Sequence, residues 1–266
     1  MGVGRIAEKM AEGVRSRGGV VHLSTEVVAL HHRNEHIHRI DALHHENLLK
    51  VETEAVVSSM PITGLVHRLR PPAPNEVLQA AARLKFRNQI QVTLFLNNET
   101  RLPDNWVYVQ DKMIPFTRFT IAHNFSRDLS PDGKTSVVFE VPCDEGDAVW
   151  KESDEAVLGL VRDHFIRHFG SLVEVKIIGT HVLRVEKEYP VFELGYRRYL
   201  DIITRYLSRF SNLQFIGRNG SFRYKNMDQS IMMGLRAARH LLGEHFNKNG
   251  EDPFGTDDGY LEEKAT

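Results

Sequence analysis

Residues that could hold an anion gather after a short apolar run at 213–216. Gly217 and Arg218 open a glycine-rich loop there, and a helix is predicted to begin just after it. Asn226 is a good N-cap for that helix, and Gln229 stands three residues later, in the capping-box position. A strand end, an arginine and a helix N-terminus together concentrate positive potential and backbone N–H groups. The spacing therefore predicts an anion site.

The helix behind this loop must be anchored if it is to position the site. Ile231, Leu235, Ala238 and Leu242 follow helical spacing. The pattern predicts that this apolar face is buried.

The residues of this stretch also carry a resemblance. The pattern Gly217-Arg-Asn-Gly-x-x-x-Tyr-x-Asn-Met-Asp-x-Ser230 is similar to the C-terminal signature of a flavoprotein group that includes amine oxidases, protoporphyrinogen oxidase and UDP-galactopyranose mutase. The likeness is closest to mutase-like and protoporphyrinogen-oxidase-like members. It implies an FAD cofactor whose pyrimidine edge faces the helix N-terminus, where N–H groups stabilise the negative charge of reduced flavin. The cofactor contacts implied here are Gly217, Arg218, Asn226, Met227, Asp228 and Gln229.

The same resemblance bears on the substrate. In galactopyranose mutases the tyrosine six residues after the arginine contacts the substrate diphosphate, and Tyr224 has that position here. Those mutases usually carry Leu-Asp before the methionine, whereas this chain has Lys225-Asn226. The resemblance therefore leaves the substrate unidentified.

The N-terminal segment allows two interpretations. Residues 2–7 match a G-x-G-x-x-A dinucleotide fingerprint with Glu26 at the ribose distance, but that fingerprint needs a strand before its first glycine, and only Met1 precedes it here. The resemblance instead implies a mid-chain flavoprotein turn, a helix, and a strand at 20–23. It places Gly2 and Gly4 near the isoalloxazine and the strand of Val27 against the adenine.

The middle of the chain is expected to form two sheets. Alternating segments between 27 and 51 predict a small antiparallel meander, and residues 55–61 resemble the strand that returns to the FAD domain. After a proline-rich boundary at 71–74, a helix at 77–84 is followed by β-prone runs that predict an antiparallel sheet. Those runs are 90–96, 105–109, 116–121, 136–141 and 173–185.

The second sheet resembles the substrate domain of the same flavoproteins. Trp106, Tyr108 and Arg118 are the substrate contacts that this match implies. A core position for the two aromatic residues remains the alternative. Helices are expected at 154–169 and around 200–207.

These elements predict an α/β fold with α+β character. Residues 1–70 and 205–246 would form an incomplete FAD-binding lobe, residues 71–204 an antiparallel-sheet substrate lobe with helices, and residues 247–266 a loose tail. The glycine-rich βαβ unit of such families is absent from the sequence. A separate chain that supplies it is therefore one expected partner, besides a small-molecule substrate.

Three functions follow from these observations. The first is part of an FAD-dependent oxidoreductase or of a flavin-dependent sugar-nucleotide enzyme. The second is a catalytically inactive fragment or binding module that keeps the flavoprotein fold, and the third is a nicotinamide-dependent enzyme. No residue can be assigned as a catalytic acid or base, which is common where flavin performs the chemistry.

Composition sets the remaining limits. Of the residues, 41% are hydrophobic and 26% charged, and the net charge of −1 gives no support for nucleic-acid binding. The single cysteine, Cys143, fits a reducing compartment, and no apolar run approaches the roughly 18 residues of a membrane span, so a cytoplasmic location is expected. The scattered histidines at 31–45, and His164 with His168, lack the converging ligands of a metal site.

Overall fold

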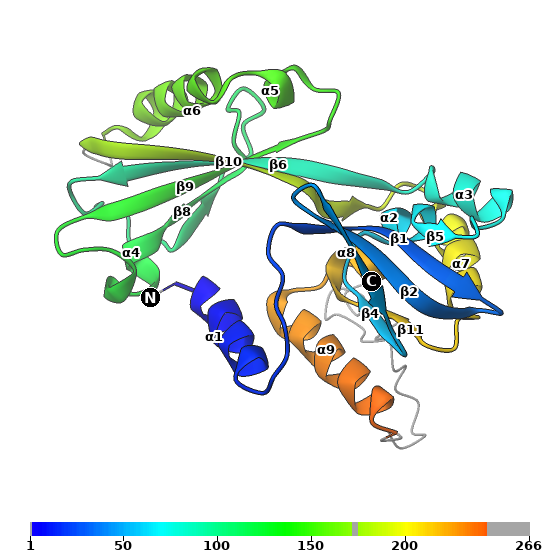
Figure 1. The fold of residues 1–266 in the computed structure, drawn as a ribbon. Coiled ribbons are helices and arrows are strands. Elements are labelled where there is room, and N and C mark those ends of the chain that lie inside the picture. The colour runs from blue at the N-terminus through cyan, green and yellow to red at the C-terminus, as the bar shows by residue number, and fades with distance from the viewer. Residues whose placement is uncertain (1, 172–174, 244–266) are drawn as a thin grey trace, which may run out of the picture. The chain divides into compact units, whose positions relative to one another are not determined.

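The computed structural model describes residues 2–171 and 175–243. By its internal contacts the chain divides into two compact units (Figure 1). The described residues within 1–21 and 87–188 form one, called here the sheet unit. Those within 22–86 and 189–266 form the other, called the mixed unit. Each unit has a hydrophobic core of its own.

The sheet unit is built on a five-stranded sheet with the order β10-β6-β9-β8-β7. Buried and partly buried residues alternate along the whole of β9, so one face of this strand meets the core. The strands predicted from the sequence are confirmed, and β6, β9, β8 and β7 pair antiparallel as expected. The part of the last run at 173–174 lies outside the described residues. The strands are β6 (Lys85–Leu96), β7 (Trp106–Tyr108), β8 (Arg118–Ile121), β9 (Thr135–Cys143) and β10 (Ile177–Val191).

The predicted helix at 154–169 is confirmed as α6 (Asp154–Phe169), and it covers one face of the sheet (Figure 1). Ser153 caps its N-terminus by accepting from the backbone N–H of Ala156. Its buried residues pack among phenylalanines of the sheet and fill the core. The unit's other helical segments are α1 (Gly4–Arg15), α4 (Ala122–Phe125), the 3₁₀ turn η1 (Arg127–Leu129) and α5 (Ala148–Lys151).

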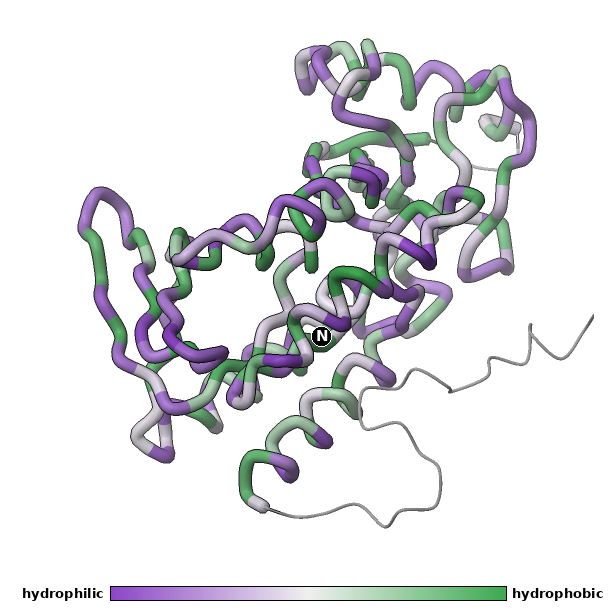
Figure 2. The backbone as a smooth tube through the Cα atoms, turned by 90° about the vertical axis from the view of Figure 1, so that its right-hand side faces the viewer, coloured by the Kyte–Doolittle hydropathy of each residue, from purple (hydrophilic) through white to green (hydrophobic). Residues whose placement is uncertain are grey.

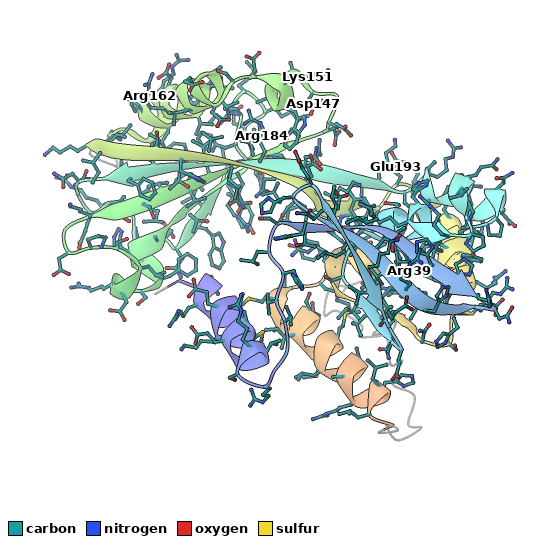
Figure 3. The ribbon with its side chains drawn as sticks, viewed as in Figure 1. Arg39, Asp147, Lys151, Arg162, Arg184 and Glu193 are labelled. Atoms are coloured by element: carbon teal, nitrogen blue, oxygen red, sulfur yellow. The ribbon has the colours of Figure 1, made fainter. Side chains whose placement is uncertain are left out.

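Arg184 on β10 ties the connection between α5 and α6 to the sheet (Figure 3). Its guanidinium donates to the backbone carbonyls of Trp150 and Glu152 and pairs with the carboxylate of Asp154. One planar group with several N–H donors thereby fixes where α6 begins.

The strand predicted at 20–23 is wrong. No regular element follows α1 until β1 (Thr25–Arg33), and Val20 and Leu23 are 72% and 70% exposed. A β-prone sequence needs a neighbouring strand to pair with, and these residues have none in the described part of the chain.

The mixed unit contains two sheets. The first has the order β3-β2-β1-β5, in which β1, β2 and β3 form the predicted meander and β5 runs parallel to β1. The second is a parallel pair, β4 with β11. The strands are β2 (His36–His44), β3 (Asn47–Glu52), β4 (Val56–Ser58), β5 (Leu69–Arg70) and β11 (Leu213–Phe215).

Helices complete this unit, and the buried residues of α2, α3 and α7 share one core with β1 and β4. The predicted helices near 77 and 200 are confirmed as α3 and α7, and both contribute to that core. The helices are α2 (Ile62–His67), α3 (Asn75–Ala81), α7 (Tyr196–Leu207), α8 (Gly217–Ser221) and α9 (Met227–Leu241).

The buried side chain of Asn212 joins three segments of the mixed unit. Its Oδ1 accepts from the N–H of Ile37 at 2.9 Å, and its Nδ2 donates to the carbonyls of Ile37 at 2.7 Å and Glu54 at 2.9 Å. One amide therefore satisfies backbone groups at the start of β2 and before β4.

The face of α9 that is buried differs from the predicted one. Met233 and Ala237 are buried, whereas Leu235 is 51% exposed and Leu242 is also exposed. Met233 and Ala237 are one turn apart and form their own stripe, so helical periodicity was right about the element and wrong about its inner face.

The two units differ from the lobes expected from sequence, which joined 1–70 with 205–246. The contacts group 1–21 with the sheet unit, and the divisions fall at 86/87 and 188/189, within β6 and β10. The expected tail at 247–266 lies outside the described residues. Hydrophobic stretches in Figure 2 are short, and no described helix has the length and apolarity to cross a membrane.

Candidate functional site

The stretch predicted as a loop between β11 and the last helix contains a short helix, α8. Gly217 begins it with φ of +75°, a conformation that L side chains rarely adopt. At Gly220 an added Cβ would lie 3.0 Å from the backbone oxygen of Ser58 on β4. The backbone conformation therefore requires glycine at 217, and the close approach of α8 to the end of β4 requires it at 220.

The side chain of Arg218 contacts two tyrosine rings and a backbone carbonyl within the mixed unit. Its guanidinium carbon lies 4.6 Å from the ring centroid of Tyr189 and 5.0 Å from that of Tyr224. The two rings are nearly parallel, with 11° between their planes and 5.7 Å between their centroids. The Nε of Arg218 donates to the backbone carbonyl of Lys225 at 3.0 Å. Cation–π contacts on two rings and a fixed Nε give this guanidinium a defined orientation.

The N-terminus of α9 follows directly. The predicted capping box is present, and the backbone N–H of Asn226 donates to the side chain of Gln229 at 2.9 Å. The Asn226 side chain in turn accepts a hydrogen bond from the backbone N–H of Gln229. Among the residues that the structure describes, the N–H groups of Met227 and Asp228 have no hydrogen-bond partner. Two of the three predicted N–H groups thus remain open for a ligand.

Lys225 is a residue that sequence reasoning passed over. It is 5% exposed, and its ammonium makes no hydrogen bond or ion pair with any described residue. Burying a lysine without a carboxylate is costly. The departure from Leu-Asp in the motif was the available signal, because it placed a cation next to Arg218 and the α9 N-terminus.

The residues implied for the cofactor are divided between the units. Val27, Arg218 and the start of α9 belong to the mixed unit, whereas Gly2 and Gly4 belong to the sheet unit. The carbonyl of Val27 accepts from Nε of Arg68. Arg68 also pairs with Glu26 at 2.6 Å. Glu26, which completed the rejected dinucleotide fingerprint, is thus engaged in an ion pair.

The three residues implied for the substrate lie together on β7 and β8. Tyr108 is opposite Arg118 in the ladder, and the guanidinium carbon lies 5.6 Å from the tyrosine ring centroid. Burial lowers the pKa of Arg118, but its bond to the Glu140 carboxylate at 2.5 Å outweighs this and raises the pKa. Trp106 is 47% and Tyr108 62% exposed, which excludes the core position left open for them.

Trp106 also stacks on Phe125, with ring centroids 5.7 Å apart and 28° between the planes. Both rings are about half exposed. The sheet unit therefore presents an exposed aromatic surface beside a fixed arginine, which suits a ring or an apolar group with an anionic substituent.

A cavity of about 380 Å³ lies within the mixed unit. Its lining combines apolar residues with two arginines and hydroxyl groups, a mixture typical of small-molecule sites. Ser221 at the end of α8 is buried in it and donates to the carbonyl of Gly217 at 2.6 Å. The lining residues are Leu200, Asp201, Thr204, Arg205, Ser208, Phe215, Ser221 and Arg223.

The histidines between 31 and 45 are distributed along the meander, and His164 and His168 lie on α6. In the described ranges no three His, Cys, Asp or Glu side chains converge as metal ligands would. His164 and His168 stack with ring centroids 5.8 Å apart on α6. His31 instead bonds Asp41, whose carboxylate also accepts from Arg39.

Comparison with known proteins adds the family. The model of the family described as flavin containing amine oxidoreductase matches residues 1–242. The search of curated proteins returned no match. Among solved structures, the chain is similar to a reduced UDP-galactopyranose mutase, with a TM-score of 0.74, 20% identity, and coverage of 90% of this chain and 51% of that one.

A putative protoporphyrinogen oxidase from Exiguobacterium sp. 255-15 is also similar, with a TM-score of 0.62 and 18% identity. The match covers 88% of this chain and 51% of that one. The chain thus spans about half the length of these structures. At these identities they show the fold, and the match of the family model over most of the sequence shows that the chain belongs to the flavin-containing amine oxidoreductases.

Proposed function

We propose that this chain forms the flavin-edge and substrate portion of an FAD-dependent oxidoreductase. The observation that carries the proposal is Arg218, held between Tyr189 and Tyr224 next to the open N–H groups of α9. Reduced flavin carries negative charge at its pyrimidine edge, and a helix N-terminus with a fixed guanidinium stabilises such charge.

The residues present fit one end of FAD. Met227 and Asp228 offer two backbone donors, and Lys225 adds a cation without a described carboxylate partner. When bound, the flavin accepts or returns the hydride, or acts as a nucleophile. The protein's part is to orient the ring, favour its anionic form and exclude water.

A glycine-rich βαβ unit would supply the missing pyrophosphate contacts, and the small parallel sheet supports this step. Parallel strands normally lie inside larger sheets covered on both faces, yet β4 and β11 pair only with each other in the described chain. On these strands the buried Ser58 Oγ and Gln214 Nε2 have no hydrogen-bond partner among described residues. Further parallel strands at this sheet would pair its free edge.

The substrate surface is proposed on the sheet unit. Trp106, Tyr108 and Arg118 combine exposed rings with a guanidinium already paired to Glu140. This surface would bind a flat or apolar substrate group by stacking, while Arg118 interacts with a negative substituent.

A second candidate is flavin-dependent sugar-nucleotide chemistry. It is favoured by Tyr224, which stacks beside Arg218 and Tyr189 with its ring half exposed. Two tyrosine hydroxyls and an arginine can bind a diphosphate. The Lys225-Asn226 pair departs from the mutase pattern, so we place this function second.

The test is an equilibrium titration of FAD with the purified chain, followed by flavin fluorescence, which detects weak binding. Arg218→Ala is expected to weaken binding by roughly ten- to a hundredfold, because it removes a charge-assisted contact worth about 1.5–3 kcal/mol. Arg197→Ala, which removes an exposed arginine of α7, is the control and should leave the affinity unchanged.

The melting temperature of each unliganded variant separates binding from folding. Arg218→Ala should lower it little, since Arg218 lies outside the hydrophobic core and Tyr224, one of the two rings it packs on, is half exposed. Equal affinity of Arg218→Ala and the unaltered chain, or no flavin binding by the unaltered chain, would overturn the proposal.

A further inference from the structure

A broad pocket on the meander of the mixed unit has no part in the proposed flavin chemistry. Its volume is about 560 Å³, and it is open to solvent. It lies where the β1–β2 hairpin meets the end of β5. The lining residues are His31, His32, Arg33, Asn34, His38, Arg70 and Pro71.

The lining of this pocket contains basic side chains and no acidic ones. Two arginines and three histidines face the pocket, and none of the lining residues is a carboxylate. Two acidic residues of the same hairpin are already paired. Asp41 bonds His31 at 2.8 Å and Arg39 at 2.9 Å, and Glu35 pairs with Arg209. The pocket therefore keeps a net positive potential.

Several of these groups are fixed in position. Nη1 of Arg70 donates to the carbonyls of His67 at 3.0 Å and Leu69 at 2.8 Å. The rest of its guanidinium has no partner among the described residues, so two further nitrogens can donate. His32 contacts the carbonyl of Pro71 at 2.9 Å and packs edge-on against Phe210, with centroids 4.9 Å apart.

Other groups are free to reach a ligand. In the described part of the chain, the exposed side chains of Arg33 and His38 make no hydrogen bond or ion pair. Arg39 lies on β2 (Figure 3) and bridges Asp41 and His31, which keeps the Asp41 carboxylate occupied. Fixed donors beside exposed basic side chains suit an oxyanion with several charged oxygens.

We propose that this pocket binds a phosphate-class oxyanion, such as the phosphate or diphosphate group of a small metabolite, at a site separate from the flavin edge. Arg70 provides fixed donors, the ring of His32 adds one when it is protonated, and Arg33 and His38 contact the anion from the hairpin. The proposal is independent of the flavin function, because it uses no residue of α8 or α9.

The test is calorimetric titration of the chain with inorganic pyrophosphate at constant ionic strength. Arg33→Gln should weaken binding about five- to tenfold, and Arg33→Gln combined with His38→Gln should weaken it further. Both side chains are exposed, so these variants are expected to fold. Arg167→Gln removes the same charge from α6, which does not line the pocket, and should change nothing.

A pH series provides a second readout. Histidines as a class gain charge on acidification towards pH 5.5, whereas sulfate keeps its charge over this range, so sulfate, used as a competing oxyanion, should displace pyrophosphate more effectively at pH 5.5 than at pH 7.5. Other charged groups on the surrounding elements are Arg39 and Asp41 on β2, Glu35 in the turn, and Arg209 after α7.

Three results would overturn the proposal. One is no binding at either pH, and another is equal weakening by Arg33→Gln and Arg167→Gln, which would indicate general charge attraction. The third is loss of pyrophosphate binding in Arg218→Ala with none in Arg33→Gln, which would place the anion at the flavin edge.

Discussion

At the scale of single residues, two cations define the candidate site. Arg218 is oriented by Tyr189 and Tyr224, and Lys225 is buried beside it. An enclosed positive charge stabilises a bound anion, and it destabilises the protein in the absence of that anion.

Because an unpaired buried charge destabilises the unliganded protein, we expect Lys225→Met to raise its stability. Methionine keeps a similar length and removes the unpaired charge, so we expect the unliganded protein to gain about 1 kcal/mol, or roughly 2–4 °C in melting temperature. Thermal unfolding measures it, with the exposed Lys50→Met as the control. A large loss of stability in Lys225→Met would mean that its ammonium already has an internal partner.

Asp41, unlike Lys225, is a buried charged group whose partners are part of the structure. Burial raises the pKa of this carboxyl, but the hydrogen bond and charge of His31, together with Arg39, outweigh it and lower the pKa below the ordinary value. A carboxyl with a lowered pKa stabilises the fold fully above about pH 4, its usual pKa, and this contribution disappears as the pH falls through the lowered value.

Asp41→Asn should therefore lower the melting temperature at pH 7 and lose less stability than the unaltered protein on acidification below about pH 4. Thermal unfolding between pH 2.5 and 7 measures the difference. The exposed Asp132→Asn is the matched control. Parallel stability curves for Asp41→Asn and the unaltered protein would show that the pairing has no effect on folding.

At the scale of elements, Asn212 shows how one buried side chain can set the placement of strands. It satisfies both backbone groups of Ile37 and the carbonyl of Glu54, all in the mixed unit. Asn212→Ala leaves these groups without partners, each at a cost of about 1–3 kcal/mol, so we expect a loss of roughly 2–4 kcal/mol. Denaturant unfolding measures it.

Asn212→Asp and Ser211→Ala separate the possible reasons. The aspartate can accept from Ile37 but cannot donate to the two carbonyls, so it should recover only part of the loss. Ser211 is exposed and its removal should cost little. Full stability in Asn212→Ala would contradict the role of this amide.

Sequence predicted elements best where a local pattern and tertiary pairing agree. The residues of β6, β9 and α6 were located correctly, because β-propensity or an amphipathic pattern coincided with a real partner. The strand expected at 20–23 failed for lack of a pairing strand, and the inner face of α9 was set by Met233 and Ala237. The helix α8 was missed, because its five residues carry a glycine at each third position.

The residues of the candidate site were likewise predictable only where they are close together in the sequence. The motif identified Arg218, Tyr224 and the α9 cap, which are close in sequence. Tyr189 comes from β10, 29 positions before Arg218 in the chain, and only the fold brings its ring against the guanidinium. Long-range contacts of this kind leave no local signal in one sequence.

At the scale of the whole molecule, the predicted contacts are distributed over two units with separate cores. Arg218 and the α9 N-terminus belong to the mixed unit, whereas Trp106, Tyr108 and Arg118, together with Gly2 and Gly4 of the cofactor set, belong to the sheet unit. The strands β6 and β10 contain the divisions between the units, so the chain passes between them through regular structure. In the proposed enzyme both units contribute contacts, and the cofactor contacts are divided between them.

How tightly the chain retains FAD should depend on which of the cofactor's contacts it contains. The flavin edge has donors in Arg218 and α9, but FAD is held mainly by its pyrophosphate, which in dinucleotide folds lies on a glycine-rich turn at a helix N-terminus. That turn is absent from the 266 residues, so we expect the chain to bind FAD weakly and to emerge colourless from gel filtration after incubation with excess FAD. Absorbance near the flavin bands, divided by protein absorbance, measures the retained fraction. Adding a polypeptide with a glycine-rich βαβ unit should raise that fraction, and the increase should be lost in Arg218→Ala. Stoichiometric yellow flavin on the chain alone would show that pyrophosphate contacts lie within these residues and that β4 and β11 need no further strands.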